Sequence, residues 1–86
     1  MERNVLIDKI TDFCLEYSII DDTLNADDFK CILNTHLKDE AFIENLINTI
    51  IVSVRTRNNV DIEVLKEILI GLEEIRLELE YKDYVA

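Results

Sequence analysis

The chain has 86 residues, nearly half of them hydrophobic, with no proline, a single glycine and a formal net charge of −10. This length allows one domain with a modest core, and the scarcity of turn residues excludes a β-sandwich or barrel, which needs frequent tight turns. So acidic a molecule is repelled by phosphate backbones and anionic lipid, and we therefore expect no direct binding of nucleic acid or membranes.

The first predicted helix covers residues 3–18. Leu6, Ile10, Phe13 and Tyr17 recur at intervals of four and three, which is typical of the buried face of an amphipathic helix. Asp8, Asp12 and Glu16 line its other side.

The acidic stretch IIDDTLNADDF follows and raises the question of a calcium loop. Such a loop needs a glycine at position 6 and a glutamate at position 12. A loop starting at Asp21 has Ala26 and Ile32 there, and one starting at Asp22 has Leu24 at position 3, where an oxygen ligand is required. Both registers fail, so we expect no metal site.

Asn25 is instead the expected N-cap of a short second helix over residues 26–37. Asp27 and Asp28 then fall in its first turn, where the helix dipole favours anions. The side chains expected to be buried on this helix are Phe29, Ile32, Leu33 and Leu37.

The third predicted helix covers residues 40–57, with Asp39 as its cap. Its apolar residues cover a wide arc, which predicts that it is the central helix of the fold. The β-branched residues in 52–57 allow a strand as the alternative. We favour the helix because a lone strand would have no partner, and because Arg55 and Arg57 suit a helix C-terminus.

The fourth and longest predicted helix covers residues 62–83 and is capped by Asp61. Its main apolar positions repeat at intervals of three and four, a pattern that packs against neighbouring helices. Gly71 lies within this pattern and predicts a close approach of another helix. The residues of this seam are Leu65, Ile68, Leu72, Ile75 and Leu79.

A second apolar stripe on the same helix consists of Ile70, Leu77 and Tyr84, seven residues apart. Two interpretations remain open. Either the helical core extends further around this helix, or the stripe contacts another molecule, as in a homodimer or a complex with a partner protein.

The sequence contains no recognisable set of catalytic residues. Cys14 and Cys31 are not in CxxC spacing and occupy apolar helical positions, so we expect buried, reduced thiols, with a disulfide between the first two helices as the alternative. His36 is the single imidazole, and no nucleophile, base and orienting group can be assembled. We predict that the protein is not an enzyme and needs no cofactor.

The sequence also lacks the Asp-Ser-Leu motif of acyl carrier proteins, because neither Ser18 nor Ser53 follows an aspartate.

The acidic residues themselves suggest a function. Asp8, Asp12 and Glu16 are four residues apart, so they form a row on the first helix, and Asp21 and Asp22 follow it in the sequence. Such a row can attract and pair with a basic site on another protein. We therefore predict a small acidic regulator or inhibitor of the immunity-protein, antitoxin or phage-inhibitor type, a comparison based on size and charge and on no motif.

The sequence as a whole predicts a single all-α domain over residues 1–86, a compact antiparallel bundle of four helices in which the second is short. We expect a cytoplasmic protein, because the first residues are charged and no apolar segment approaches the roughly 20 residues that span a bilayer. The alternative function is a structural or assembly protein, a homo-oligomer or accessory subunit that associates through apolar surface on the last helix.

Overall fold

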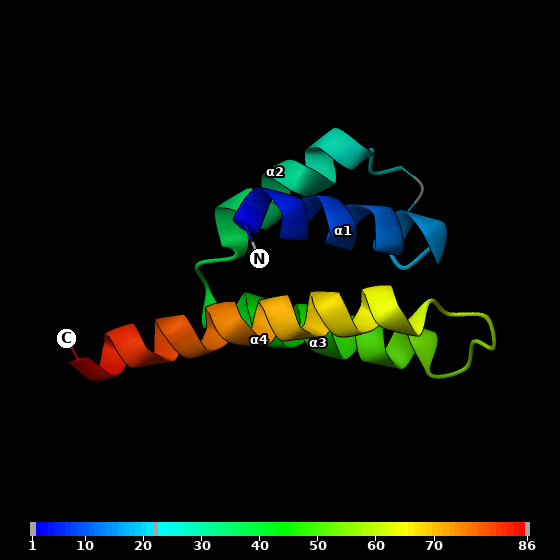
Figure 1. The fold of residues 1–86 in the computed structure, drawn as a ribbon. Helices are drawn as coiled ribbons and strands as arrows, with labels where there is room; N and C mark the ends of the chain where they lie inside the picture. Colours follow the sequence, from blue (N-terminus) through cyan, green and yellow to red (C-terminus); the bar gives the residue numbers. More distant parts are fainter. Residues whose placement is uncertain (1, 22, 86) are drawn as a thin grey trace.

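The computed structural model of the protein describes residues 2–21 and 23–85, with side chains described as far as Lys82. The fold is all-α, as the sequence predicts, and the described residues contain no strand (Figure 1). The four helices are α1 (Arg3–Glu16), α2 (Ala26–His36), α3 (Glu40–Val54) and α4 (Ile62–Val85).

The helices form two layers, each made of two consecutive helices that run in opposite directions. Figure 1 shows α1 and α2 in the upper layer and α3 and α4 in the lower one. Helix α1 packs against both α2 and α4, and α4 packs against both α1 and α3. The central helices are therefore α1 and α4. The prediction that α3 is central was wrong, because its arc of apolar residues is wider than its contact with α4 and leaves Ile51 and Val52 exposed.

The core is built from the apolar faces that the spacing predicts. On α4, Ile68, Leu72 and Ile75 are buried, and Leu65 and Leu79 pack at its edge. Other fully buried large side chains come from all three remaining helices and the loop that follows α2: Leu6, Ile10, Phe13, Leu33, Leu37, Ile43 and Ile50.

Helix starts are capped by the three residues that the sequence identifies. Asn25 Oδ1 accepts a hydrogen bond from the Asp28 backbone N–H at 2.8 Å, and Asp39 Oδ1 accepts one from Ala41 at 3.0 Å. At the start of α4, the Asp61 carboxylate accepts from the backbone of Val64 at 3.3 Å. Each bond satisfies one backbone donor that the first helical turn leaves without a partner.

The end of α1 comes two residues earlier than predicted. Ser18 adopts a φ of 53°, in the left-handed region. The Ile19 N–H then reaches the Cys14 carbonyl at 2.8 Å, and the Ser18 N–H reaches that of Leu15 at 3.3 Å. These two bonds define a Schellman motif, which usually has glycine at the left-handed position. Because serine occupies it here, the sequence lacked the ordinary stop signal.

Helix α4 approaches α1 closely at Gly71. A Cβ atom built there would lie 2.7 Å from Leu6 Cδ1, closer than van der Waals contact allows. The predicted close contact with another helix is therefore confirmed, and it is made by the Leu6 side chain of α1.

The last turns of α4 extend beyond the rest of the bundle (Figure 1). The longest dimension of the molecule is 42 Å, and its radius of gyration is 13.0 Å. A compact chain of this length would have a radius of gyration of about 12 Å. Tyr81, in the protruding part, is 71% exposed.

The two cysteines differ in environment. Cys14 is fully buried on α1, as predicted, and burial raises the pKa of its thiol to about 12. Cys31 is exposed, which corrects the prediction that both are buried. It lies two residues from both Phe29 and Leu33, the buried residues of α2, and therefore on the opposite side of that helix. Both thiols are free, so the alternative of a disulfide does not hold.

Candidate protein-binding surfaces

Three carboxylates from two elements line a hollow between α1 and the start of α4. Asp12 and Glu16 reach it from α1, and Asp61 reaches it from the loop that precedes α4. The hollow has a volume of about 200 Å³, and Phe13 and Val64 contribute apolar surface to its lining. We refer to this site as the acidic hollow.

The Tyr17 hydroxyl holds Asp61 beside α1. It accepts a hydrogen bond from the Asp61 backbone N–H at 2.9 Å and donates one to the Asn59 carbonyl at 3.3 Å. Its ring packs on Phe13 with centroids 4.6 Å apart. Sequence reasoning placed Tyr17 only in the buried stripe and missed this role, because its partners are more than forty residues away in the chain.

Lys9 is the single base among the residues that line the acidic hollow, and its ammonium group contacts the Glu67 carboxylate. Among the described residues, Asp12, Glu16 and Asp61 form no ion pair. The hollow therefore carries excess negative charge beside apolar surface.

The other predicted contact residues lie elsewhere. Asp8 faces α2 and pairs with Lys30 at 3.2 Å, in a different hollow, between α1 and α2. Asp21 Oδ1 accepts a hydrogen bond from the Thr23 backbone N–H at 3.1 Å, so its carboxylate stabilises the turn. Asp22 lies outside the described residues. The structure thus brings Asp12 and Glu16 together with Asp61, a residue that the sequence suggested only as a helix cap.

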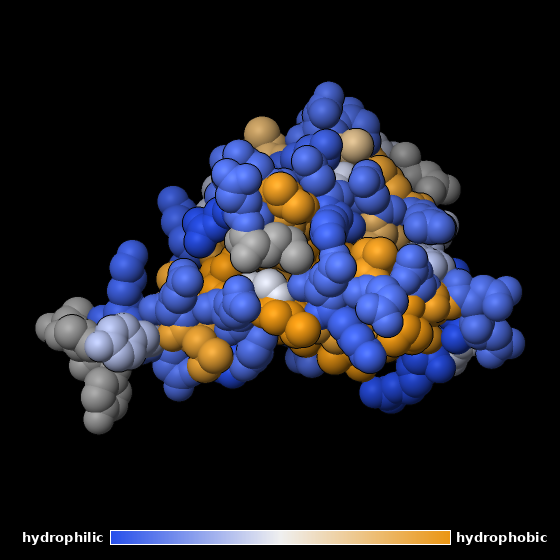
Figure 2. Space-filling view, in the orientation of Figure 1, coloured by the Kyte–Doolittle hydropathy of each residue, from blue (hydrophilic) through white to orange (hydrophobic). Residues whose placement is uncertain are grey.

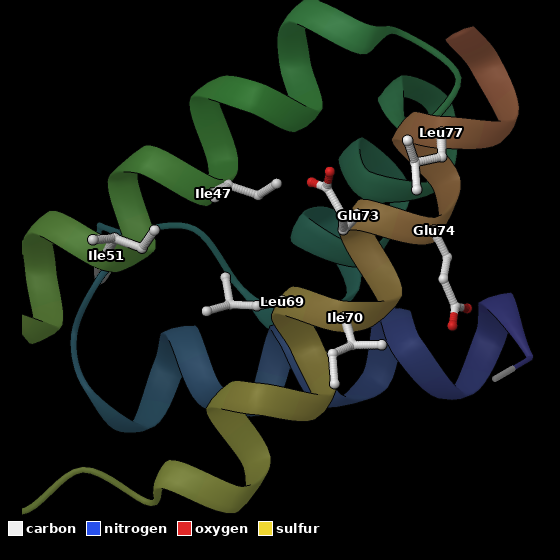
Figure 3. A pocket seen from close by; sticks show the side chains of 7 residues that line it. All are labelled: Ile47, Ile51, Leu69, Ile70, Glu73, Glu74 and Leu77. Carbon is white, nitrogen blue, oxygen red and sulfur yellow. The ribbon is translucent and has the colours of Figure 1, made fainter. Parts of the chain in front are cut away.

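A second surface is an open apolar groove of about 460 Å³ between α3 and α4, with two carboxylates at its edge. Figure 3 shows Ile47 and Leu69 pointing into the space between the two helices. Figure 2 shows hydrophobic side chains at the surface of the lower layer, where α4 runs. We refer to this site as the α3–α4 groove, and its lining residues are Ile47, Ile51, Leu69, Ile70, Glu73, Glu74 and Leu77.

The predicted second stripe of α4 forms one side of this groove. Ile70 is 60% exposed and Leu77 is 52% exposed, so the α3–α4 contact does not cover them. The side chain of Tyr84 lies outside the described residues. Of the two interpretations left open by the sequence, the extended core therefore does not apply to Ile70 and Leu77.

Arg76 lies next to the groove and is surrounded by carboxylates. It contacts Glu73 through two nitrogens, and its Nη1 lies 3.9 Å from Glu40 on α3 and 3.8 Å from Glu80. The hydrogen bond from Arg76 lowers the pKa of Glu73, and the carboxylates raise that of Arg76. One base is thus shared by three acids, and Glu74 forms no ion pair among the described residues.

Metal sites and membrane-spanning helices are two further possibilities that the described residues allow us to check. Within the described part of the chain, no three His, Cys, Asp or Glu side chains gather closely enough to hold a metal ion. No helix of that part combines the length and hydrophobicity needed to cross a membrane.

No protein-family model, curated protein or solved structure matches the sequence or the fold.

Proposed function

We propose that this protein is a small acidic regulator or inhibitor that docks a basic site on another protein through the acidic hollow. The observation that carries the proposal is that Asp12, Glu16 and Asp61 line one hollow, where the single lining base among the described residues, Lys9, pairs with Glu67 instead. The hollow is smaller than the roughly 300–1,000 Å³ typical of small-molecule sites, which favours a single side chain as its occupant.

An arginine or lysine of the partner matches this hollow in two ways. Its apolar stem would lie on Phe13 and Val64, and its charged end would reach the carboxylates. The net charge of −10 would also increase the rate of encounter with a basic partner. We place this activity in the cytoplasm, where free thiols such as Cys14 and Cys31 stay reduced.

The test is affinity capture of partners from native cell lysate with the wild-type chain and the Asp12→Asn/Glu16→Gln variant. A Glu2→Gln/Glu78→Gln variant is the matched control, because it removes the same charge from exposed positions outside the hollow. We expect the captured partner to be lost from the first variant and retained by the second, and capture to weaken between about 0.05 and 0.3 M salt. Equal retention by both variants would refute this binding site.

The second candidate function is that of an accessory subunit or homo-oligomer that associates through the last helix. The exposure of Ile70 and Leu77 in the α3–α4 groove favours it. Association through apolar surface would persist at moderate salt, whereas docking through the acidic hollow would not.

A further inference from the structure

We infer that the α3–α4 groove binds an amphipathic helix of a partner protein that carries lysine or arginine beside its apolar face. This inference concerns a different surface from the acidic hollow, so it does not depend on the proposed function.

The lining of the groove selects a helix over other peptide conformations. An added strand needs a sheet edge, and the described residues form no sheet. A polyproline segment is recognised by aromatic side chains, whereas the described residues that line the groove are isoleucine, leucine and glutamate. A phosphorylated peptide needs clustered bases, whereas this edge is acidic. A small molecule would remain largely uncovered, because the groove is open.

The dimensions of the groove also fit a helix. Its lining on α4 extends from Leu69 to Leu77, which corresponds to about 12 Å at the helical rise. A docked helix presents apolar residues at positions i, i+3 or i+4 and i+7 over a similar length. Ile47 and Ile51 are one turn apart on α3 and form the opposite wall. Two antiparallel helices with such a groove can hold a third one.

The charge around the groove specifies a basic partner. Glu73 and Glu74 lie at its edge, and Arg76 beside it is already shared by Glu73, Glu40 and Glu80. A second copy of this chain would bring a further net charge of −10 and the same acidic edge. Anionic lipid would be repelled for the same reason. Lysine or arginine beside the apolar face of a partner helix would instead neutralise Glu74.

The test uses three labelled synthetic peptides of about 15 residues, long enough to form a helix. One has leucines along one helical face and lysines beside them, the second has glutamates in place of the lysines, and the third is a scramble of the first that lacks an apolar face. Fluorescence anisotropy measures affinity, and methyl NMR shifts locate the bound peptide. We expect the lysine peptide to bind at least about tenfold more tightly than the other two, and to shift the methyl groups of Ile47, Ile51, Leu69, Ile70 and Leu77.

Variants of the protein identify the contact. Ile70→Ser and Leu77→Ser should each weaken binding of the lysine peptide about tenfold, and Glu74→Lys about threefold to tenfold. Val52→Ser is the matched control, because Val52 is 61% exposed on α3 outside the groove, and it should leave the affinity unchanged. Glu74→Lys keeps every apolar residue, so its effect does not depend on how the serine variants fold.

Two results would overturn the inference. One is equal affinity for the lysine peptide and its scramble, which would mean that charge alone attracts the peptide. The other is a tight dimer in sedimentation equilibrium that Ile70→Ser dissociates, which would make a second copy the occupant. Asp12→Asn/Glu16→Gln should leave peptide binding at the groove intact, so failure of this inference and failure of the proposed function are distinguishable.

Discussion

Helix α4 contacts its two neighbours in different ways. Toward α1 it presents Gly71, and the buried Leu6 side chain packs so closely on it that no room remains for a Cβ atom. Toward α3 the contact ends in an open groove, with Arg76 and its carboxylates beside it. The first interface holds the two layers together, whereas the second leaves apolar and charged groups free for another molecule.

Substitutions on the two faces of α4 should therefore differ most in stability. Leu72→Ala removes a side chain with no exposed surface and should lower the free energy of unfolding by about 2–5 kcal/mol, because it leaves a cavity. Leu77→Ala, at a position 52% exposed, should cost less than about 1 kcal/mol. Urea unfolding followed by circular dichroism measures both changes, and equal losses would contradict the distinction between the faces.

The close approach at Gly71 predicts a smaller loss with a defined cause. Gly71→Ala should destabilise the protein by up to about 2 kcal/mol, because the buried Leu6 side chain must shift and this cost exceeds the gain of about 1 kcal/mol in helix propensity. In a Leu6→Ala background the conflict is removed, so the same change should become stabilising. A double-mutant cycle by urea unfolding measures this coupling. Additive effects would show that Leu6 is not the obstacle.

The ion pairs of Arg76 should make the stability of the protein depend on salt and pH. Arg76→Met should destabilise the protein less than Leu72→Ala, and the loss should shrink as salt screens the ion pairs. Because Arg76 lowers the pKa of Glu73 in the folded state, its stabilising effect is present above about pH 4.5 and is lost as the pH falls below that value. Unfolding curves at several pH values test this, with Lys66→Met, outside any ion pair of the described residues, as the control.

Thiol labelling of the wild-type protein should distinguish the buried Cys14 from the exposed Cys31, and it requires no substitution. Cys31 is exposed and should react with iodoacetamide first. Cys14 is buried and should react only when the fold opens. The raised pKa of Cys14, about 12, further lowers its thiolate fraction near neutral pH. Mass spectrometry of a labelling time course measures the order. Simultaneous labelling of both residues would indicate that α1 detaches easily from the core.

Local signals predicted most of this fold. Asn25, Asp39 and Asp61 marked three helix starts because capping depends on neighbouring residues alone. The end of α1 was missed because Ser18 adopts a backbone conformation that favours glycine. The intervals of three and four on α4 identified the buried seam, and Gly71 marked the close contact, since both reflect helix geometry.

The candidate site depends on contacts that spacing does not encode. The regular row of Asp8, Asp12 and Glu16 turns gradually around α1, so Asp8 faces α2 while the other two face α4. Nothing in the sequence indicated that Asp61 would join them, because that depends on how the two layers pack. The prediction that α3 is central failed for the same reason. The apolar residues of α3 show how much of its surface can be buried, but they do not show which helices cover that surface.

The hydrogen bonds of Tyr17 have a consequence for the order of events in folding. They join α1 of one layer to the loop before α4 of the other, so the acidic hollow cannot exist in a chain whose two helical hairpins have formed separately. A partner that binds the hollow would thus recognise only completed molecules and would ignore folding intermediates. Tyr17→Phe, which keeps the ring and removes the hydroxyl, would release Asp61 from α1 and weaken binding at the hollow.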